Sequence, residues 1–207
     1  MKVYLMVTVL QALLLGFQGI TYILVQRIQG EYHDVQLKCD RKIPLQSQWV
    51  YIYILWYPLI AVYPLYLYSC SERLYIACIA AAVADILGSM VVYVLFPTSF
   101  QRPVPSGVTL SDKILCKIYL ADYKGLNCMP SMHCSMCYII MCSSVITSAN
   151  GFMPISVCLC IVVLALLIIL STLFTKQHVL ADVIAALPLG IFCCWFGMII
   201  IDTLNLQ

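Results

Sequence analysis

Two of the three histidines in the chain stand in short stretches whose neighbouring residues could bind an anion. The first stretch, 128–133, reads Cys-Met-Pro-Ser-Met-His. Pro130 suits the opening turn of a helix, because its missing N–H is not needed there. Ser131, Met132 and His133 would then be early helical residues. Their unpaired backbone N–H groups and the positive end of the helix dipole favour an anion.

The second stretch, 176–182, reads Lys-Gln-His-Val-Leu-Ala-Asp. His178 and Asp182 are four residues apart, so on a helix they share one face. A carboxylate in that position can hold one imidazole nitrogen and leave the other free as a nucleophile or a base. With Lys176 beside them, the two histidine stretches together indicate phosphate chemistry.

A third stretch, 96–103, reads Phe-Pro-Thr-Ser-Phe-Gln-Arg-Pro. Arg102 precedes a proline, which favours an extended backbone, and its guanidinium fork suits two phosphate oxygens at once. Alone, Arg102 and Lys176 are typical of interfacial side chains that reach toward the membrane surface. Their occurrence together with the two histidines favours a phosphate site.

The composition is that of a membrane protein: 63% of the 207 residues are hydrophobic and 10% are charged. Apolar runs near twenty residues, about the length that crosses a bilayer, recur along the chain. They predict membrane helices at 4–25, 49–68, 74–96, 131–149, 154–172 and 179–201. We therefore predict one all-α integral-membrane domain over 1–207, a bundle of six helices with both termini on the same side. The net charge of +2 argues against a nucleic-acid partner.

The connections between the spans place the chemistry at one membrane face. The polar segment 27–47, the long loop 97–129 and the turn before His178 all fall on the same side of the predicted bundle. Within the long loop, 111–123 is expected to form an amphipathic helix at the interface. Pro58 and Pro64 are expected to kink the second span.

Taken in order, the three stretches resemble the motifs of the type-2 phosphatidic acid phosphatase family. They read Pro-Thr-x-x-x-Arg-Pro, then Pro-Ser-x-His, then Ser-x-x-x-x-x-x-His-x-x-x-Asp, and they lie within 97–182. The third begins at Ser171. The Phe-Pro-Thr…Arg-Pro form, with Thr-Lys-Gln-His, is closer to the branch that contains sphingomyelin and inositol phosphorylceramide synthases.

The resemblance implies a role for each residue. His178 would attack phosphorus and form a phosphohistidine, with Asp182 fixing its tautomer. His133 would protonate the leaving oxygen and then activate water. The phosphate oxygens would be held by Arg102, Lys176, Ser131 and the N–H of Met132. No metal and no cofactor would be needed.

Three positions depart from the family pattern. The usual lysine, seven residues before the Arg-Pro arginine, falls on Leu95, and the arginine usually next to the third-motif serine is Thr172. Lys176 could replace one lost charge, but as a point charge and not as a fork. Met132 stands where glycine is common. These departures leave room for an altered substrate or for an inactive site.

Other residues offer weaker candidates. Cys128, His133, Cys134 and Cys137 could be interpreted as a zinc cluster, but a second Cys-x-x-Cys is missing from the sequence. We therefore predict no metal site. Asp85 lies near the centre of the third span, where a carboxylate is either functional or protonated and hydrogen-bonded. His33 lies in a charged loop and is expected to be solvated.

The leading hypothesis is an integral-membrane lipid phosphatase that acts on a lipid phosphate monoester or diphosphate. A lipid phosphotransferase, in which an alcohol replaces water, is the second hypothesis. A non-catalytic lipid-binding or transport bundle with a relic site is the third, and the joint presence of His133, His178 and Asp182 argues against it. The sequence leaves the head group, the lipid chain and the oligomeric state open.

Two arguments conflict on the orientation in the membrane. The face that carries the site has nine lysines and arginines and the opposite face has two, so the positive-inside rule would make the site cytoplasmic. Relatives of this family usually place the site on the outer or lumenal face, and several of the nine charges bind phosphate on this interpretation. We predict a multi-pass protein of the plasma or inner membrane with an extracytoplasmic site.

Overall fold

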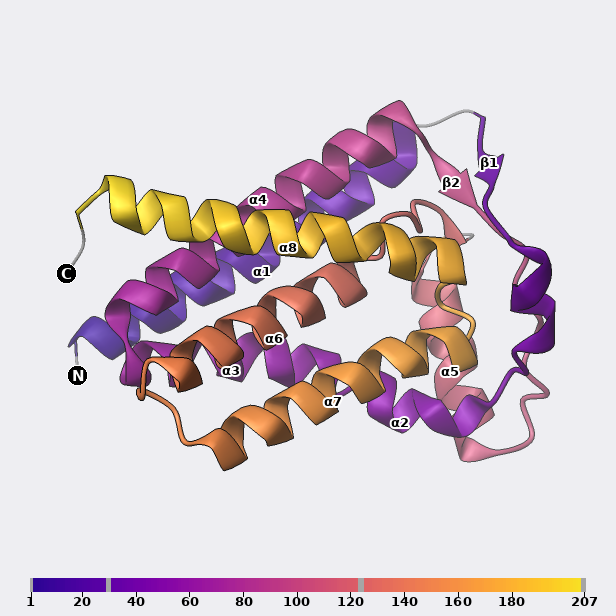
Figure 1. The fold of residues 1–207 in the computed structure, drawn as a ribbon. Coiled ribbons are helices and arrows are strands. Elements are labelled where there is room, and N and C mark those ends of the chain that lie inside the picture. The colour runs from indigo at the N-terminus through magenta and orange to yellow at the C-terminus, as the bar shows by residue number, and fades with distance from the viewer. Residues whose placement is uncertain (1, 29–30, 123–124, 206–207) are drawn as a thin grey trace.

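The computed structural model describes residues 2–28, 31–122 and 125–205, and its long helices run side by side as a bundle (Figure 1). These helices are α1 (Lys2–Ile28), α3 (Trp56–Cys70), α4 (Glu72–Leu95), α6 (Met132–Ala149), α7 (Ile155–Phe174) and α8 (Leu180–Thr203). Among the described residues, six helical segments are long and apolar enough to cross a membrane. The second of them, Ser47–Cys70, joins the 3-10 helix η2 (Ser47–Trp49) and the short helix α2 (Val50–Tyr53) to α3. The predicted all-α membrane bundle is confirmed.

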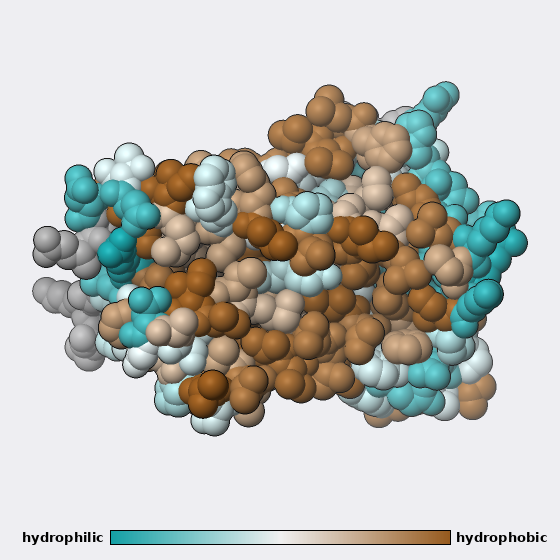
Figure 2. Space-filling model, in the orientation of Figure 1, coloured by the Kyte–Doolittle hydropathy of each residue, from teal (hydrophilic) through white to brown (hydrophobic). Residues whose placement is uncertain are grey.

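The predicted spans differ from these segments by at most three residues at either end, which is close to the usual uncertainty of helix boundaries. Helix α1 begins, and α8 ends, at the same end of the bundle (Figure 1), as an even number of spans requires. The space-filling view shows a broad apolar band between two hydrophilic ends (Figure 2). The bundle therefore presents the surface expected of a multi-pass membrane protein.

The other end of the bundle is covered by short elements from the two long loops (Figure 1). They are β1 (His33–Asp34), the 3-10 helix η1 (Lys38–Lys42), β2 (Thr98–Ser99) and α5 (Leu110–Ala121). The two strands pair in parallel, with His33 opposite Thr98. His33 is exposed, as predicted, and its ring also stacks on Phe96.

Helix α5 confirms the helix predicted at 111–123, although Tyr123 lies outside the described residues. It runs crosswise to the long helices (Figure 1). Its start is fixed by a reciprocal cap, in which Thr109 Oγ1 accepts the N–H of Asp112 and Asp112 Oδ2 accepts the N–H of Thr109. At its other end, the Tyr119 hydroxyl donates to the carbonyl of Thr175, which joins α5 to the end of α7.

The two prolines of the second span differ in their place relative to its helices. The helix is interrupted between α2 and α3, four residues before Pro58, whose nitrogen cannot donate to the carbonyl of Ile54. Pro64 lies inside α3 and frees the carbonyl of Ile60 in the same way. That carbonyl accepts a hydrogen bond of 2.8 Å from Gln11 Nε2 of α1. A side chain on α1 thus repairs the gap that Pro64 leaves.

Helix α6 is central to the bundle and α1 is peripheral. In the most apolar window of each span, 56% of residues are buried in α6 but only 11% in α1. Helix α8 packs closely on α4, where Gly197 lies so near the backbone of Ala77 that a Cβ would collide with it. Helix α1 makes its main contacts with α3 and α4. In the described part of the chain, it has no comparable contact with another long helix.

Gln11→Leu should lower the stability of the protein by about 1 kcal/mol, because the carbonyl of Ile60 then has no donor in the membrane interior. In a Pro64→Ala background the loss should be smaller, because alanine at position 64 supplies the backbone N–H that the carbonyl of Ile60 otherwise lacks. Thermal unfolding of the four proteins in the same detergent gives the double-mutant cycle. Equal losses in both backgrounds would contradict this account of Gln11.

Candidate active site

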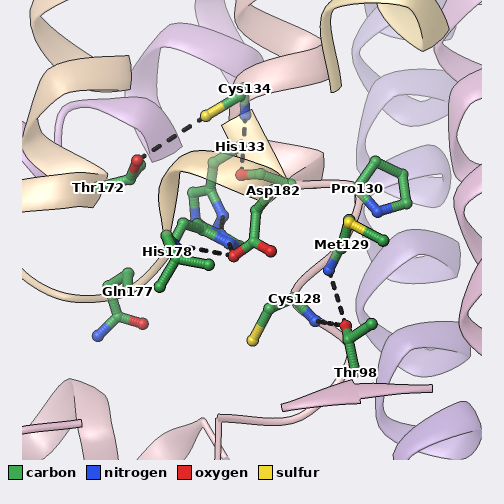
Figure 3. A network of polar contacts seen from close by, with 12 residues as sticks. Thr98, Cys128, Met129, Pro130, His133, Cys134, Thr172, Gln177, His178 and Asp182 are labelled. Atoms are coloured by element: carbon green, nitrogen blue, oxygen red, sulfur yellow. Dashed lines mark hydrogen bonds and ion pairs between the residues drawn. The ribbon is translucent and has the colours of Figure 1, made fainter. Parts of the chain in front are cut away.

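The three residues predicted to carry the reaction meet where α6 and α8 begin (Figure 3). His178 Nδ1 lies 3.2 Å from Asp182 Oδ2, and His178 Nε2 lies 3.5 Å from His133 Nδ1. His133 Nε2 in turn lies 2.8 Å from the hydroxyl of Tyr53. The structure therefore brings both histidines and the carboxylate together, with the two imidazoles facing each other.

These contacts fit one arrangement of protons. Asp182 can only accept while it is ionised, so His178 Nδ1 carries its proton and His178 Nε2 keeps its lone pair. His133 then directs an Nδ1 proton at that lone pair and accepts from Tyr53 at Nε2. We assign this pattern because every partner in it has a complementary role. It leaves the nitrogen of His178 that faces His133 with a free lone pair.

The turn before His178 is built by the end of α7. The N–H of Gln177 donates to the carbonyl of Thr172, and the N–H of Lys176 donates to that of Leu173. These are the two bonds of a Schellman motif, in which the residue after the cap adopts a left-handed backbone. Lys176 does so with φ at 52°. The carbonyl of Thr172 also accepts the N–H of His178, so the end of α7 fixes the backbone of His178 directly.

The start of α8 is fixed by two carboxylates. Asp182 Oδ2, which holds His178, also accepts the N–H of Val179 at 3.0 Å. Asp40, from the loop after α1, accepts the N–H of Leu180 at 2.9 Å through Oδ1. Both carboxylates lie at the positive end of the helix, where negative charge is favoured. Asp182 therefore orients the imidazole and caps the helix with one oxygen.

The start of α6 differs by one residue from the prediction. Ser131 is the N-cap, its Oγ accepts the N–H of Cys134, and Pro130 precedes the cap instead of forming the opening turn. A serine hydroxyl satisfies a helix-start N–H, which makes serine a better cap than proline. The N–H of Ser131 donates to the carbonyl of Asp182 at 3.2 Å. Ser131 thus ties the starts of α6 and α8 together.

Thr98 holds the segment that leads into α6 (Figure 3). Its hydroxyl oxygen accepts the N–H of Cys128 at 3.1 Å and the N–H of Met129 at 3.0 Å. The side chain is fully buried. Thr98 belongs to the Pro-Thr…Arg-Pro stretch, so that stretch positions the Pro-Ser-x-His stretch by hydrogen bonds to its backbone.

Arg102 reaches the same site. Its Nη2 donates to Asp122 Oδ2 at 2.6 Å and to the carbonyl of Gln177 at 3.2 Å. Burial alone would lower the pKa of the guanidinium, but the neighbouring Asp122 carboxylate raises it above its usual value. Gly125 has φ at +62°, and a Cβ on it would lie 2.9 Å from Arg102 Nε. Glycine thus lets the guanidinium lie directly against the backbone.

Lys176 lies elsewhere. Its Nζ donates to the carbonyl of Asp40 at 2.9 Å, and it does not line the cavity that holds the histidines. Burial lowers the pKa of Lys176 from its usual value. Leu95 is exposed and Thr172 is buried against Cys134, and neither lines that cavity. Positions 95, 172 and 176 therefore place no cation beside the histidines, and of the predicted phosphate-binding cations only Arg102 lines the cavity.

A cavity of about 460 Å³ contains the site. Its lining includes Arg102, Met132, His133 and His178. Several of its residues have buried polar atoms that lack a hydrogen-bond partner, namely Trp56 Nε1, Arg102 Nε, both amide atoms of Asn127 and Gln177 Nε2. Buried donors without partners are rare in folded proteins. Their gathering around one cavity indicates a site for a ligand with several acceptor oxygens.

Sequence reasoning missed five of these residues: Tyr53, Trp56, Asp122, Asn127 and Gln177. The ring of Trp56 lies over His133, with 4.2 Å between centroids. Asp122 accepts from Tyr22 and Arg102 and so joins α1 to the site. Gln177, next to His178, carried the clearest signal, because the residue beside a site residue in a tight turn often faces the same space. The others come close to the site only in the folded chain.

Three residues of the site could together hold a metal ion, and they are the one such group among the described residues. Cys128, His178 and Asp182 offer ligand atoms within 4.8 Å of one another. A thiol, an imidazole and a carboxylate suit Zn²⁺. This is not the cluster considered from the sequence, because the sulfur of Cys134 lies 3.8 Å from Thr172 Oγ1 instead.

Asp85 lies outside the cavity. It is completely buried, and its Oδ2 accepts a hydrogen bond of 2.8 Å from Ser135 of α6. The hydrogen bond to Ser135 is part of one of the two alternatives that the sequence left open, and the role of Asp85 stays a prediction. Asp85 does not line the cavity with the two histidines.

The sequence of the chain matches the model of one known protein family. The family model described as PAP2 superfamily matches residues 73–206, which is more than half of the chain. The chain belongs to the PAP2 superfamily. The PAP2 match contains all three motif stretches and α4 to α8, whereas α1, Tyr53 and Trp56 precede it. No curated protein and no solved structure matched the chain.

Thr98→Val should destabilise the protein by about 1–3 kcal/mol, because valine keeps the shape and leaves two backbone N–H groups without an acceptor. Thr98→Ser keeps the oxygen and should cost less. Thermal unfolding of both variants in detergent makes the comparison. If the two melt at the same temperature, the hydroxyl does not hold the segment before α6.

Proposed function

We propose that this PAP2 protein is an integral-membrane lipid phosphatase, which hydrolyses a lipid phosphate monoester or diphosphate without a metal ion. One observation carries the proposal. His178 is held at Nδ1 by Asp182 while its Nε2 faces His133, inside a cavity with unpartnered donors. A nucleophile, an orienting carboxylate, a second imidazole and an anion site are what two-step phosphoryl transfer requires.

In the first step, His178 Nε2 attacks phosphorus and the bond from phosphorus to the ester oxygen breaks. His133, which takes up a second proton as the substrate binds, gives that proton to the ester oxygen, and the lipid alcohol (or, from a diphosphate, the lipid monophosphate) leaves. Arg102 and the neutral donors of Asn127 and Gln177 stabilise the charge on the equatorial oxygens. The N-terminus of α6 at Ser131 and Met132 contributes the positive end of its dipole. In this mechanism Lys176 does not contact the phosphate. It helps to form the turn before His178 and bonds to the carbonyl of Asp40.

In the second step, water attacks the phosphohistidine and the phosphorus–nitrogen bond breaks. His133, now neutral, takes a proton from the water, and inorganic phosphate leaves with His178 restored. Asp182 keeps its charge throughout and stabilises the positive imidazole of the intermediate. Both steps use the same two imidazoles, because they already face each other.

We propose that water reaches this site from the side of the loops. Arg102 lines the cavity and also a second hollow of about 610 Å³, whose other walls are Tyr32, Asp34, Ser99, Phe100 and Gln101. This hollow is lined by residues of the loops at the hydrophilic end, and Arg102 is a lining residue of both spaces. That position supports hydrolysis. A phosphotransferase of the sphingomyelin or inositol phosphorylceramide synthase type is the second candidate, because the largely apolar cavity could also exclude water.

We further propose that residues 1–207 act as one membrane domain and that the site faces the extracytoplasmic side of the plasma or inner membrane. The contact of α1 with the site through Tyr22 supports the first part. The second part rests on the resemblance to relatives with outward-facing sites.

His178→Ala and His178→Asn should each abolish phosphate release from lipid phosphates, by at least about a thousandfold, because the phosphohistidine cannot form without this imidazole. Asp182→Asn should reduce the rate less, since it removes charge and orientation but leaves the nucleophile. Phosphate release by purified proteins in detergent measures all three, with a panel of lipid phosphates as substrates. Substantial activity in either His178 variant would exclude this imidazole as nucleophile.

The acceptor can be tested with one labelled substrate. Purified protein is given a lipid phosphate labelled at phosphorus, together with a large excess of inositol, glycerol or ceramide. We expect most of the label as free phosphate, because water reaches the site from the loop side. If the label appears mainly in a new phosphate ester or phosphodiester, the protein is a transferase.

A further inference from the structure

The cavity extends well beyond the two histidines. From the phosphate site it continues between α1 and α3, where its lining consists mainly of apolar side chains. The lining residues of α1 and α3 include Leu15, Gly19, Ile23, Trp56, Tyr57 and Ile60, and α1 also contributes the polar side chains of Gln18 and Tyr22. The charged and titratable residues of the lining, apart from tyrosines and a cysteine, are Arg102, Asp122, His133 and His178, which belong to the phosphate end. The cavity is therefore polar at one end and apolar at the other.

The apolar end opens on the surface of the bundle. Gly19, Ile23 and Tyr57 line the cavity and are nevertheless exposed. All three lie within the segments that are long and apolar enough to cross a membrane. The lining of α1 from Leu15 to Ile23 covers about 12 Å along the helix axis, at 1.5 Å per residue. The opening thus faces lipid and not water.

Polar contacts hold α1 on both sides of this space. Toward the far end, Gln11 Nε2 donates to the carbonyl of Ile60, and beside the cavity Gln18 Nε2 lies 3.0 Å from the sulfur of Met132. Toward the site, Tyr22 donates to Asp122 Oδ1 at 3.0 Å. Between these contacts, a Cβ on Gly19 would meet no atom within 4 Å. Helix α1 is therefore fixed to α3 at Gln11, and the small residue Gly19 leaves open space beside it nearer the site.

We propose that the extension between α1 and α3 binds a hydrocarbon chain of the substrate, which enters sideways from the bilayer. The inference rests on the proposed function and narrows it to lipids whose chain lies along α1 while the phosphate reaches His178. The volume of the cavity falls within the range of cavities that enclose most of a bound ligand. The segment that matches the PAP2 family begins after α3, so this wall is built by helices that the match does not include.

The chain offers a matched pair of glycines for the test. Gly16 and Gly19 lie on the same helix, both are exposed, and a Cβ on either would meet nothing within 4 Å. Gly19 lines the cavity, whereas Gly16 does not. With a long-chain lipid phosphate, Gly19→Trp should lower kcat/KM at least tenfold, while Gly16→Trp should stay within twofold of the unmodified protein. With a water-soluble short-chain phosphate ester, the two variants should be equal.

The outcomes separate this inference from the proposed function. If the unmodified protein releases phosphate and both glycine variants behave alike on the long-chain substrate, the chain site is excluded and the phosphatase stands. If the unmodified protein releases phosphate from no lipid phosphate, the proposed function fails. In that case, a measurement of lipid binding tests whether the cavity holds the hydrocarbon chain.

Binding is measured with a lipid phosphate that carries a photoreactive group in its chain, added to the His178→Ala variant in vesicles so that no turnover occurs. We expect the label in peptides that contain Leu15 to Ile23 and Trp56 to Ile60, and we expect Gly19→Trp to reduce it severalfold. Label distributed over the lipid-facing sides of α7 and α8, and unchanged by Gly19→Trp, would overturn the proposal.

Discussion

The carboxylate of Asp182 is the interaction on which the arrangement of the site depends. It is completely buried, and one of its oxygens both caps α8 at Val179 and holds Nδ1 of His178. The carbonyl of the same residue accepts the N–H of Ser131, where α6 begins. Since one residue fixes a helix start, an imidazole and a neighbouring helix, the distance between the two histidines follows from backbone geometry and not from flexible side chains. Charge-assisted hydrogen bonds of this kind are also about twice as strong as neutral ones.

The proposed anion site consists mainly of neutral groups. Positions that carry lysine and arginine in the usual PAP2 pattern hold Leu95 and Thr172, and the charge of Arg102 is opposed by Asp122 at 2.6 Å. A guanidinium that is already paired offers less attraction to a phosphate than a free one. Unpartnered donors, such as the amides of Asn127 and Gln177, then supply hydrogen bonds in place of charge. The Asp122 pairing also ties α1 to the site through Tyr22, so the same contact serves packing and binding.

The sequence predicted those features that depend on local periodicity. Hydropathy placed the spans, and the spacing of His178 and Asp182 predicted their contact, although His178 precedes α8 and does not share a helix face with Asp182. The predicted start of α6 was wrong by one residue, because the serine hydroxyl outweighs the preference of proline for the first turn. Lys176 was expected at the phosphate, but its positive φ turns the chain so that Gln177 lines the cavity instead. Tyr53 and Trp56 reach His133 across about eighty residues of sequence, and no local pattern encodes such a contact.

The cavity divides its chemistry along its length. The imidazoles and Arg102 come from the starts of α6 and α8 and from the loop after α4, whereas the apolar extension is built by α1 and α3. Helix α1 is the most exposed span, so the side chains between its polar contacts at Gln11, Gln18 and Tyr22 can vary while those contacts stay in place. A membrane enzyme built in this way can change the lipid chain that it accepts and keep the same phosphoryl chemistry. On the chain site proposed above, the peripheral position of α1 allows it to contact the lipid chain.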